Sequence, residues 1–444
     1  MSGRRRSAAW FLAAALLLAA CTGSSGQART PSVSPARPTL LPSSPESPSP
    51  APDGPGSAQA ALAKLCPGPA QPPPTGVTPE GPTPPAIRTV ERQIQQVREL
   101  RFIDPLQVEA VSHPELVKEL RASLASSYPR DQYRRRSLAW QTIGAIPPGT
   151  DLRAALERFA GTQVIGFYDT LTKQLVFQGG EDPTPFERVT LAHELTHALD
   201  DQHYGLSRID RLGQMCNDEA YSAAVGAVEG SATYFMLAYA QRYLSLKDQL
   251  QIGLQSGPST AGIPPFVLQS ESWSYTAGLA FMRAMAARGG LQAIDGALQH
   301  FPVSTEQVIH PERYPNDVPT PVDVPQLAPE LGPGWKDLDV MEVGEEYLSI
   351  LLGLRIDQAV AIQAAAGWDG GIYRAWSKGD RVAMELATVW DTATDARGFS
   401  DAMESWIGSG GSSAATVLPV DGTHVRVLFA SDAPTLELLR KAAG

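Results

Sequence analysis

The sequence has little cysteine, few aromatic residues and fewer basic than acidic side chains. With three cysteines in 444 residues, the chain is neither a disulfide-dense scaffold nor a multi-cysteine zinc or iron–sulfur protein. Lysine and arginine number 36 against 47 aspartates and glutamates, and the net charge of −11 argues against a broad nucleic-acid-binding surface. Aromatic residues make up only 7%, which offers no obvious platform for carbohydrate. The hydrophobic fraction of 43% still suffices for a sizeable core.

Long hydrophobic runs are also lacking. The apolar run 10–20 follows three arginines at 4–6 and is shorter than the roughly 20 residues that a membrane-spanning helix needs. This pattern is typical of a signal peptide. The run ends in small residues and Cys21, which resembles the bacterial lipobox, where the leader is cut before a cysteine that becomes lipidated. The resemblance implies a signal peptide over 1–20 and a chain anchored on the extracytoplasmic face of the cell membrane; a plain secretory signal is the alternative.

Residues 21–86 hold nearly half of the 38 prolines, mixed with serine, threonine, alanine and glycine. Such a composition cannot bury a core, so we expect a disordered, extended tether between the membrane and the folded part. Export places Cys66 and Cys216 in an oxidising compartment, where a disulfide between them can persist. Two separate buried thiols are the alternative.

The remaining chain has mainly helical periodicity. Apolar residues at helical spacing predict a helical N-terminal lobe over 87–160. Within an expected catalytic domain at 161–410, the runs 163–168 and 174–177 flank a polar turn and predict a β-hairpin. Residues 411–444 are expected to form a C-terminal hairpin and tail. We therefore predict an α+β fold that is mainly helical with a small sheet. The helices expected after the hairpin cover 185–202, 217–246, 273–289, 291–299, 345–353, 357–366 and 398–407.

The helix expected near residue 190 contains the motif H-E-x-x-H, formed by His193, Glu194 and His197. Four residues make about one helical turn, so both imidazoles project from one face and can bind one metal ion. Glu194 is placed to take a proton from a water molecule that a bound Zn²⁺ activates. Three of the seven histidines lie between 193 and 203, which favours a metal site over an incidental polar face.

A catalytic zinc ion usually has three protein ligands, and two residues compete for the third place. Glu229 lies on a later predicted helix among small and apolar residues, where an unpaired carboxylate is costly to bury. A metal ion removes that cost, and a salt bridge to an arginine is the alternative. His203 has the metzincin spacing, but Asp200 stands where that class has glycine. Because a residue six places after His197 on an unbroken helix points away from the metal, we favour Glu229.

These residues resemble a bacterial family of uncharacterised, exported, HExxH-containing zinc metallopeptidases, many of which are lipoproteins. The matching stretches are 193–203, 228–230, 275–281, 304–314 and, more weakly, 366–370 and 390–392. The resemblance implies a zincin-like, gluzincin-type peptidase domain with Zn²⁺ held by His193, His197 and Glu229. Asp200 departs from the expected glutamine, which changes a charge near the metal without touching a ligand.

Hydrolysis also needs a donor for the oxyanion of the tetrahedral intermediate, and a downstream His or Tyr serves in gluzincin-like sites. His310 and Tyr275 are the natural candidates. The alternative for His310 is a structural hydrogen bond that fixes the His-Pro turn. For Tyr275 the alternative is a packed aromatic residue on a helix.

The sequence therefore favours a membrane-tethered zinc metallopeptidase that acts on a protein or peptide outside the cytoplasm and binds no nucleic acid. A non-catalytic cell-envelope lipoprotein with a structural or vestigial metal site is the main alternative. A zinc hydrolase acting on a cell-wall amide ranks last. The helical segment 88–160 is expected to be the first lobe of the catalytic domain, with a built-in inhibitor as the alternative.

Overall fold

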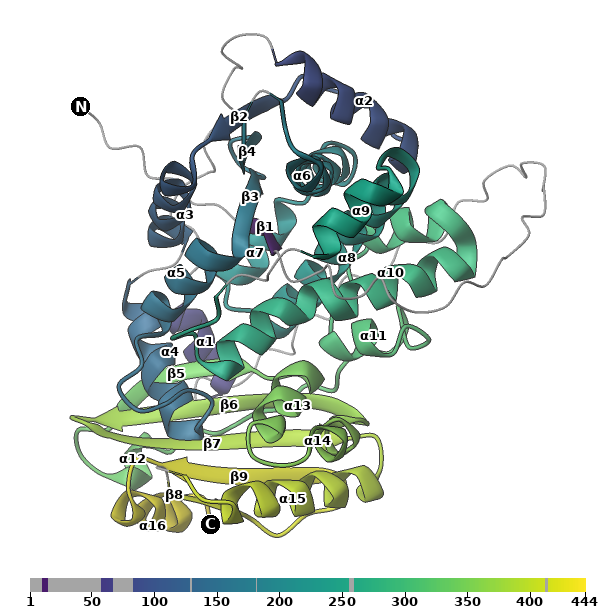
Figure 1. Cartoon of the computed structure of the whole chain (residues 1–444). Coiled ribbons are helices and arrows are strands. Elements are labelled where there is room, and N and C mark those ends of the chain that lie inside the picture. Colours follow the sequence, from purple (N-terminus) through teal and green to yellow (C-terminus); the bar gives the residue numbers. More distant parts are fainter. Residues whose placement is uncertain are drawn as a thin grey trace.

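The structure is a computed structural model that describes residues 10–14, 57–66, 83–127, 130–180, 182–254, 259–411 and 414–444. It combines helices with two sheets, in agreement with the expected α+β class. One region holds most of the long helices and a four-stranded sheet, and the other is built on a five-stranded sheet (Figure 1). No helix within the described ranges is long and apolar enough to cross a membrane.

The four-stranded sheet carries the expected hairpin. Strands β3 (Val164–Asp169) and β4 (Gln174–Gln178) pair in antiparallel fashion around a turn in which Asp169 accepts hydrogen bonds from the backbone of the following residues. Strand β2 (Gln107–Val111) lies parallel to β4. Strand β1 (Trp10–Ala14) lies antiparallel to β3, so the order is β1-β3-β4-β2. The structure thus places part of the expected signal peptide at the edge of this sheet.

Helices surround this sheet and form a hydrophobic core together with it. Helix α6 starts at Thr184, which caps it together with Glu187, and ends at Gly205, whose positive φ terminates the helix. Helix α10 breaks at Gly289 and Gly290, as the expected pair of helices requires. The helices between residues 85 and 309 are α2 (Pro85–Arg98), α3 (His113–Ser127), α4 (Arg130–Ile143), α5 (Leu152–Gln163), α6 (Pro185–Tyr204), α7 (Arg208–Gln214), α8 (Asp218–Tyr243), α9 (Leu246–Gly253), α10 (Pro265–Gln299) and α11 (Thr305–Ile309).

Helices α8 and α10 approach each other unusually closely because glycines line their crossing. A Cβ atom on Gly278 would overlap the backbone of Gly226, and one on Gly230 would overlap the backbone of Gly278. Only hydrogen atoms fit between the two backbones at these positions. The crossing fixes where neighbouring side chains of the two helices lie relative to one another along the helix axes. Glu229 on α8 and Tyr275 on α10 are among these side chains.

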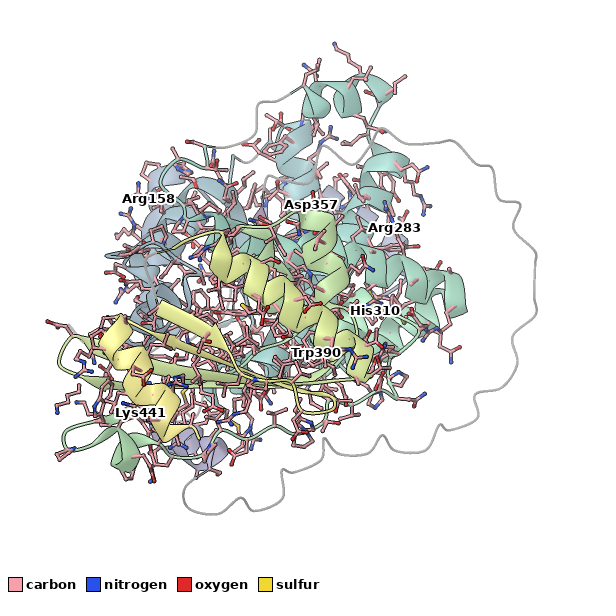
Figure 2. All side chains as sticks on the ribbon, turned by 90° about the horizontal axis from the view of Figure 1, so that it is seen from below. Arg158, Arg283, His310, Asp357, Trp390 and Lys441 are labelled. Atoms are coloured by element: carbon pink, nitrogen blue, oxygen red, sulfur yellow. A yellow bond between two sulfur atoms is a disulfide. The ribbon has the colours of Figure 1, made fainter. Side chains whose placement is uncertain are left out.

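The C-terminal region differs from the expected hairpin and tail. Strands β5 (Lys336–Glu342), β6 (Trp368–Lys378), β7 (Arg381–Trp390), β9 (His424–Ala430) and β8 (Ala414–Val417) form one antiparallel sheet in that order. Residues 411–444 are therefore part of a larger unit, and the expected boundary at 410 cuts through it. Figure 2 shows this unit from below, with Lys441 of α16 and Trp390 of β7 labelled. Its helices are α12 (Ala328–Leu331), α13 (Glu345–Gly353), α14 (Gln358–Ala365), α15 (Ala393–Gly408) and α16 (Ala433–Ala442).

Both faces of this sheet are covered. Tyr373 and Met384 point toward the core that contains α4, α13, α14 and α15. Trp376 and Ala383, on the opposite face, pack with α1, α12 and α16. Because α4 belongs to the expected N-terminal lobe, residues 87–160 do not form a lobe of their own: α2 packs on α6, whereas α4 packs on β5 and β7.

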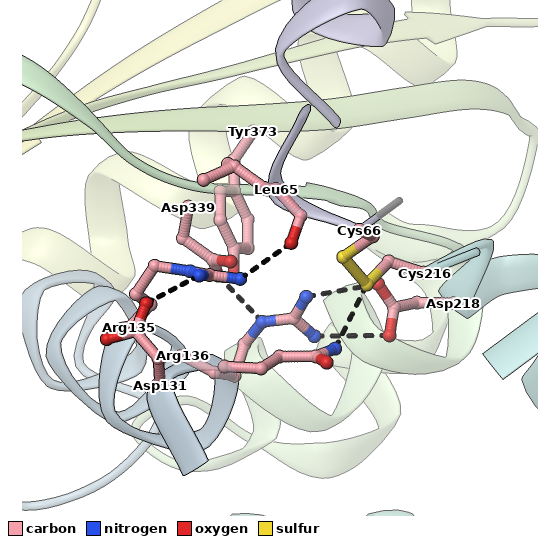
Figure 3. Close-up of a disulfide and its surroundings, with 10 residues drawn as sticks. Leu65, Cys66, Asp131, Arg135, Arg136, Cys216, Asp218, Asp339 and Tyr373 are labelled. Atoms are coloured by element: carbon pink, nitrogen blue, oxygen red, sulfur yellow. Dashed lines mark hydrogen bonds and ion pairs between the residues drawn. A yellow bond between two sulfur atoms is a disulfide. The ribbon is translucent and has the colours of Figure 1, made fainter. Parts of the chain in front are cut away.

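The expected tether also departs from a uniformly extended chain. Helix α1 (Ala58–Leu65) buries three apolar side chains, and its N terminus is held by Asp323, which accepts a hydrogen bond from Ala58 N. The disulfide between Cys66 and Cys216 joins the end of this helix to the turn before α8 (Figure 3). Ala58, Ala61, Leu62 and Leu65 recur at helical spacing and supply the apolar stripe that a proline-rich tether lacks.

A buried arginine next to the disulfide connects the two regions. Arg136 of α4 forms ion pairs with Asp339 of β5 at 2.7 Å and with Asp218 of α8 at 3.1 Å (Figure 3). Tyr373 donates a hydrogen bond to the same Asp339 carboxylate. The two carboxylates raise the pKa of Arg136 despite its burial, so its charge is retained. The ion pairs of Arg136 thus join the helices beside the small sheet to the large sheet through a buried cation.

Candidate metal centre

Helix α6 presents the two histidines of the HExxH motif on one face. His193 and His197 have no solvent exposure, and their Nε2 atoms lie 3.0 Å apart. Burial lowers the pKa of His193 to about 3 and that of His197 to about 4, with Glu229 partly opposing the shift at His197. Both imidazoles are therefore neutral near pH 7, which leaves lone pairs available for a metal ion.

Glu229 of α8 completes a group of three potential ligands. Its Oε2 atom lies 3.1 Å from His193 Nε2 and 3.6 Å from His197 Nε2. Among the described residues, His193, His197 and Glu229 form the group that could hold a metal ion. Around a zinc ion with ligand distances of 2.0–2.2 Å, tetrahedral geometry separates the ligand atoms by about 3.4 Å. The observed separations fit that requirement, and the donor set of two imidazoles and one carboxylate suits Zn²⁺.

Glu194 lies beside this group and is completely buried. Its side chain packs against strand β3 at Gly166, where an added Cβ would lie 3.1 Å from Glu194 Cγ. A larger residue at 166 would therefore displace the carboxylate. The close packing of β3 against Glu194 thus depends on the absence of a side chain at Gly166, which no motif in the sequence indicates.

Tyr275 is brought to the site by the crossing of α8 and α10. Its ring stacks on the imidazole of His193, with centroids 6.1 Å apart and planes inclined by 29°. Among the described residues, none forms a hydrogen bond with Nδ1 of His193. Packing, including this stack, therefore orients the His193 ring.

The alternative third ligand, His203, is excluded by its position. Helix α6 continues without interruption to Tyr204, so His203 points away from the metal group. Its Nε2 atom lies 2.8 Å from the carbonyl oxygen of Arg101 at the surface. The glycine that would turn the chain toward the metal is replaced by Asp200, and the helix does not bend there.

His310 is not brought to the metal group. Its Nε2 atom lies 3.0 Å from Glu345 Oε1, and this carboxylate raises the pKa of His310. It lies near Trp390 (Figure 2), and the ion pair between Arg313 and Asp391 joins the same two segments. The described contacts of His310 are those of a residue that fixes the chain before Pro311. They do not support the expected oxyanion role.

Asp200 has a clear structural partner. Its carboxylate accepts hydrogen bonds from Arg98 Nε at 2.7 Å and from Ser231 Oγ at 2.7 Å. Arg98 of α2 also pairs with Asp295 of α10 at 2.6 Å. Burial raises the pKa of Asp200 and the nearby Arg98 lowers it. The charge that Asp200 adds near the metal ligands is thus paired with Arg98, and α2 is an integral part of the site's support.

A cavity of about 260 Å³ opens directly beside the metal group. Glu229 and Tyr275 form part of its wall. The other side chains that line it include Tyr133, Trp140, Trp273, Glu271, Glu346 and Tyr347. No local pattern in the sequence indicates that these residues meet, because they lie on three different helices, α4, α10 and α13. Only the position of Glu271 one helical turn before Tyr275 could have indicated that the two share a face.

Cys21, the expected lipidation site, lies outside the described residues. The other expected site residues are all placed, and the structure joins Cys66 to Cys216.

Comparison with known proteins concerns only the C-terminal region. Residues 336–440, which contain the five-stranded sheet, match a family described as a domain of unknown function (DUF8575). Neither curated proteins nor solved structures gave a match to the chain. The residues of the metal group lie outside the matched segment. The chain is thus similar to a domain family without an assigned function over its large sheet.

Proposed function

We propose that this protein is a membrane-anchored, extracytoplasmic, zinc-dependent metallopeptidase that hydrolyses peptide bonds in a protein or peptide substrate. The observation that carries the proposal is the convergence of His193, His197 and Glu229 with Glu194 beside them. A purely structural zinc site normally uses four protein ligands and needs no base. Three neutral or anionic ligand atoms next to a buried carboxylate suit a catalytic site instead.

When bound in this site, Zn²⁺ supplies a Lewis acid that lowers the pKa of water and polarises a carbonyl group. Glu194 takes the proton of the attacking water and later gives it to the leaving amine. His193 and His197 hold their neutral form, which burial favours. Tyr275 holds the His193 ring and remains the candidate for donating to the oxyanion.

Strand β1 supports an extended peptide as the substrate. Its backbone pairs with β3 in antiparallel fashion, and it contacts the ligand-bearing helices α6 and α8. Residues 10–14 belong to the expected leader, so cleavage before Cys21 removes this strand and leaves the edge of β3 open. A substrate segment can then add to the same edge through main-chain hydrogen bonds.

The test is to measure zinc content and peptide cleavage together on the purified mature protein, for the wild type and for Glu194→Gln. We expect about one zinc ion per chain in both proteins. Removal of the general base should lower turnover by about 100-fold or more, because proton transfer loses its acceptor.

Glu404→Gln is the matched control, since Glu404 is exposed on α15 and far from the expected chemistry. Its turnover should equal that of the wild type. Full turnover in Glu194→Gln contradicts the mechanism. Zinc binding without cleavage of any peptide in a library would instead favour the non-catalytic lipoprotein.

The membrane anchor is a separate prediction that rests on the lipobox around Cys21. Cys21→Ala should move the protein from the membrane fraction to the soluble fraction of the cell and abolish its labelling by a fatty-acid analogue, because no thiol remains for lipidation. Cys66→Ala is the control, and it should leave fractionation and labelling unchanged. Membrane retention of Cys21→Ala would contradict the lipid anchor.

A further inference from the structure

The cavity beside the metal group combines carboxylates with aromatic walls. We propose that it is a specificity pocket that receives a cationic side chain, arginine or lysine, of the substrate, and that Glu271 is the residue that binds its charge. This inference rests on the proposed peptidase function. It adds the substrate class, which neither the motif nor the fold specifies.

The size of the cavity suits one side chain. Its volume of about 260 Å³ is below the 300–1,000 Å³ typical of sites for drug-sized ligands. Because Glu229 and Tyr275 form part of its wall, a side chain that fills it belongs to a residue close to the bond at the metal. Such a pocket selects among substrates through the side chain next to the cleaved bond.

The charge of the cavity suits a cation. The side chain of Glu271 lines the cavity, and among the described residues the hydrogen bond that Ser274 Oγ donates to Glu271 goes to its backbone oxygen, not to its carboxylate. The carboxylate of Glu346 accepts a hydrogen bond from Ser270 Oγ at 2.8 Å. Arg136 also lines the cavity, but Asp218 and Asp339 already neutralise it. The cavity therefore keeps negative charge that its own cation does not balance.

The electrostatic consequence is visible at both glutamates. Burial, followed by the nearby Glu229, raises the pKa of Glu271 to about 7. Burial and the nearby Glu271 raise the pKa of Glu346 to about 7, against the opposing hydrogen bond from Ser270. A guanidinium or ammonium group between them stabilises both ionised carboxylates.

A second and independent feature is a buried hydroxyl group without a partner. Tyr347 is 3% exposed and lines the cavity, and within the described residues its Oη atom has no hydrogen-bond partner. Leaving a buried hydroxyl unpaired is costly. An N–H group of a bound arginine side chain would donate to this oxygen. Trp140 and Trp273 also line the cavity, and aromatic rings can make favourable contacts with a cation.

The first experiment measures binding without catalysis. Argininamide is titrated into the mature protein after zinc removal, and binding is followed by calorimetry or by tryptophan fluorescence. Citrullinamide, which has the same shape without the charge, is the control ligand. We expect argininamide to bind about tenfold or more tightly than citrullinamide. Equal affinities would overturn the proposal.

Two variants separate binding from folding. Glu271→Gln should abolish the preference for argininamide, and the matched control Glu404→Gln should keep it. Tyr347→Phe should weaken argininamide binding by a few-fold while leaving the unfolding midpoint unchanged or higher, since the lost hydroxyl has no hydrogen-bond partner among the described residues. An unchanged preference in a folded Glu271→Gln would overturn the assignment of that residue.

The second experiment measures kcat/KM of the zinc-loaded protein for peptides that differ only by arginine, lysine, citrulline or norleucine at one position. We expect the cationic peptides to be preferred, and Glu271→Gln to remove most of the preference. Cleavage without any such preference would overturn the pocket but leave the peptidase. Selective argininamide binding without cleavage of any peptide would overturn the peptidase but leave the pocket.

Discussion

At the scale of single residues, the site is defined by which polar atoms are buried together. His193, His197 and Glu229 place three ligand atoms within 4.8 Å of one another without solvent exposure beyond 1%. His203 has suitable chemistry but faces Arg101 at the surface. Whether a histidine can bind the metal therefore depends less on its position in the sequence than on the face of the helix from which it projects.

The different positions of Glu229 and His203 predict different effects on metal affinity when each is replaced. Glu229→Gln should lower the affinity for zinc by more than about 100-fold, because the loss of a ligand exceeds the 10–100-fold effect of losing a supporting hydrogen bond. His203→Ala should leave affinity unchanged. Competition with a chromophoric chelator measures both. Normal affinity in Glu229→Gln, or a loss in His203→Ala, would reverse the assignment of the third ligand.

At the scale of elements, the site depends on how closely α8 and α10 cross. Gly226 and Gly230 of α8 face Gly278 of α10, and no side chain separates the two backbones there. A wider crossing would move Tyr275 away from His193 and change the wall of the cavity. The glycines thus have a packing role that their low helix propensity alone would not justify.

Substitution at the crossing should destabilise the protein strongly. Gly278→Ala forces a Cβ atom into the backbone of Gly226, and we expect a loss of about 3 kcal/mol or more in the free energy of unfolding. Gly296→Ala on the same helix is the control. No atom lies within 4 Å of its added Cβ, so the change should be neutral or stabilising by up to about 1 kcal/mol. Urea denaturation measures both, and similar midpoints for the two variants would contradict a tight crossing.

The large sheet shows why strands were harder to predict than helices. Strand β6 is buried on both faces, so polar and apolar residues do not alternate along it. Without that alternation, short apolar runs at 368–378 and 381–390 cannot be told from buried helix. The hairpin of β3 and β4 was predictable because its polar turn separates two runs rich in β-branched and aromatic residues.

At the scale of the whole molecule, the interior holds several carboxyl groups with raised pKa values. Burial is the largest cause in each case. The groups and their pKa values are Glu219 and Glu306 at about 8, and Glu271 and Glu346 at about 7. An acid whose pKa is raised on folding stabilises the fold below its unfolded value near 4.5 and loses this contribution as pH rises through the folded value.

The stability of the zinc-free protein should therefore fall between pH 6.5 and pH 8. The lowered pKa values of His193 and His197 have the opposite effect, but only below pH 6.5, where the unfolded chain takes up their protons. We expect the melting temperature to drop by several degrees across this window. Glu219→Gln should reduce the drop and Glu404→Gln should not. A constant or rising melting temperature would show that the buried glutamates ionise at their ordinary pH.

The sequence by itself determined the local features. Helical periodicity places His193, Glu194 and His197 within one turn, and the capping residues at Thr184 and Gly205 delimit their helix. These features depend only on residues close together in the chain. The same holds for the hairpin before the helix and for the break of α10 at Gly289 and Gly290.

Only the tertiary structure decided which distant residues meet. Glu229 reaches the two histidines because α8 packs on α6, and Tyr275 reaches them because glycines let α8 and α10 cross closely. The cavity with Glu271 and Tyr347 forms where α10 and α13 meet several other elements. The docking of α1 through the Cys66–Cys216 bond likewise depends on a long-range contact. Residue spacing along one helix is fixed by its 3.6-residue period, whereas contacts between elements follow from packing, which no local pattern encodes.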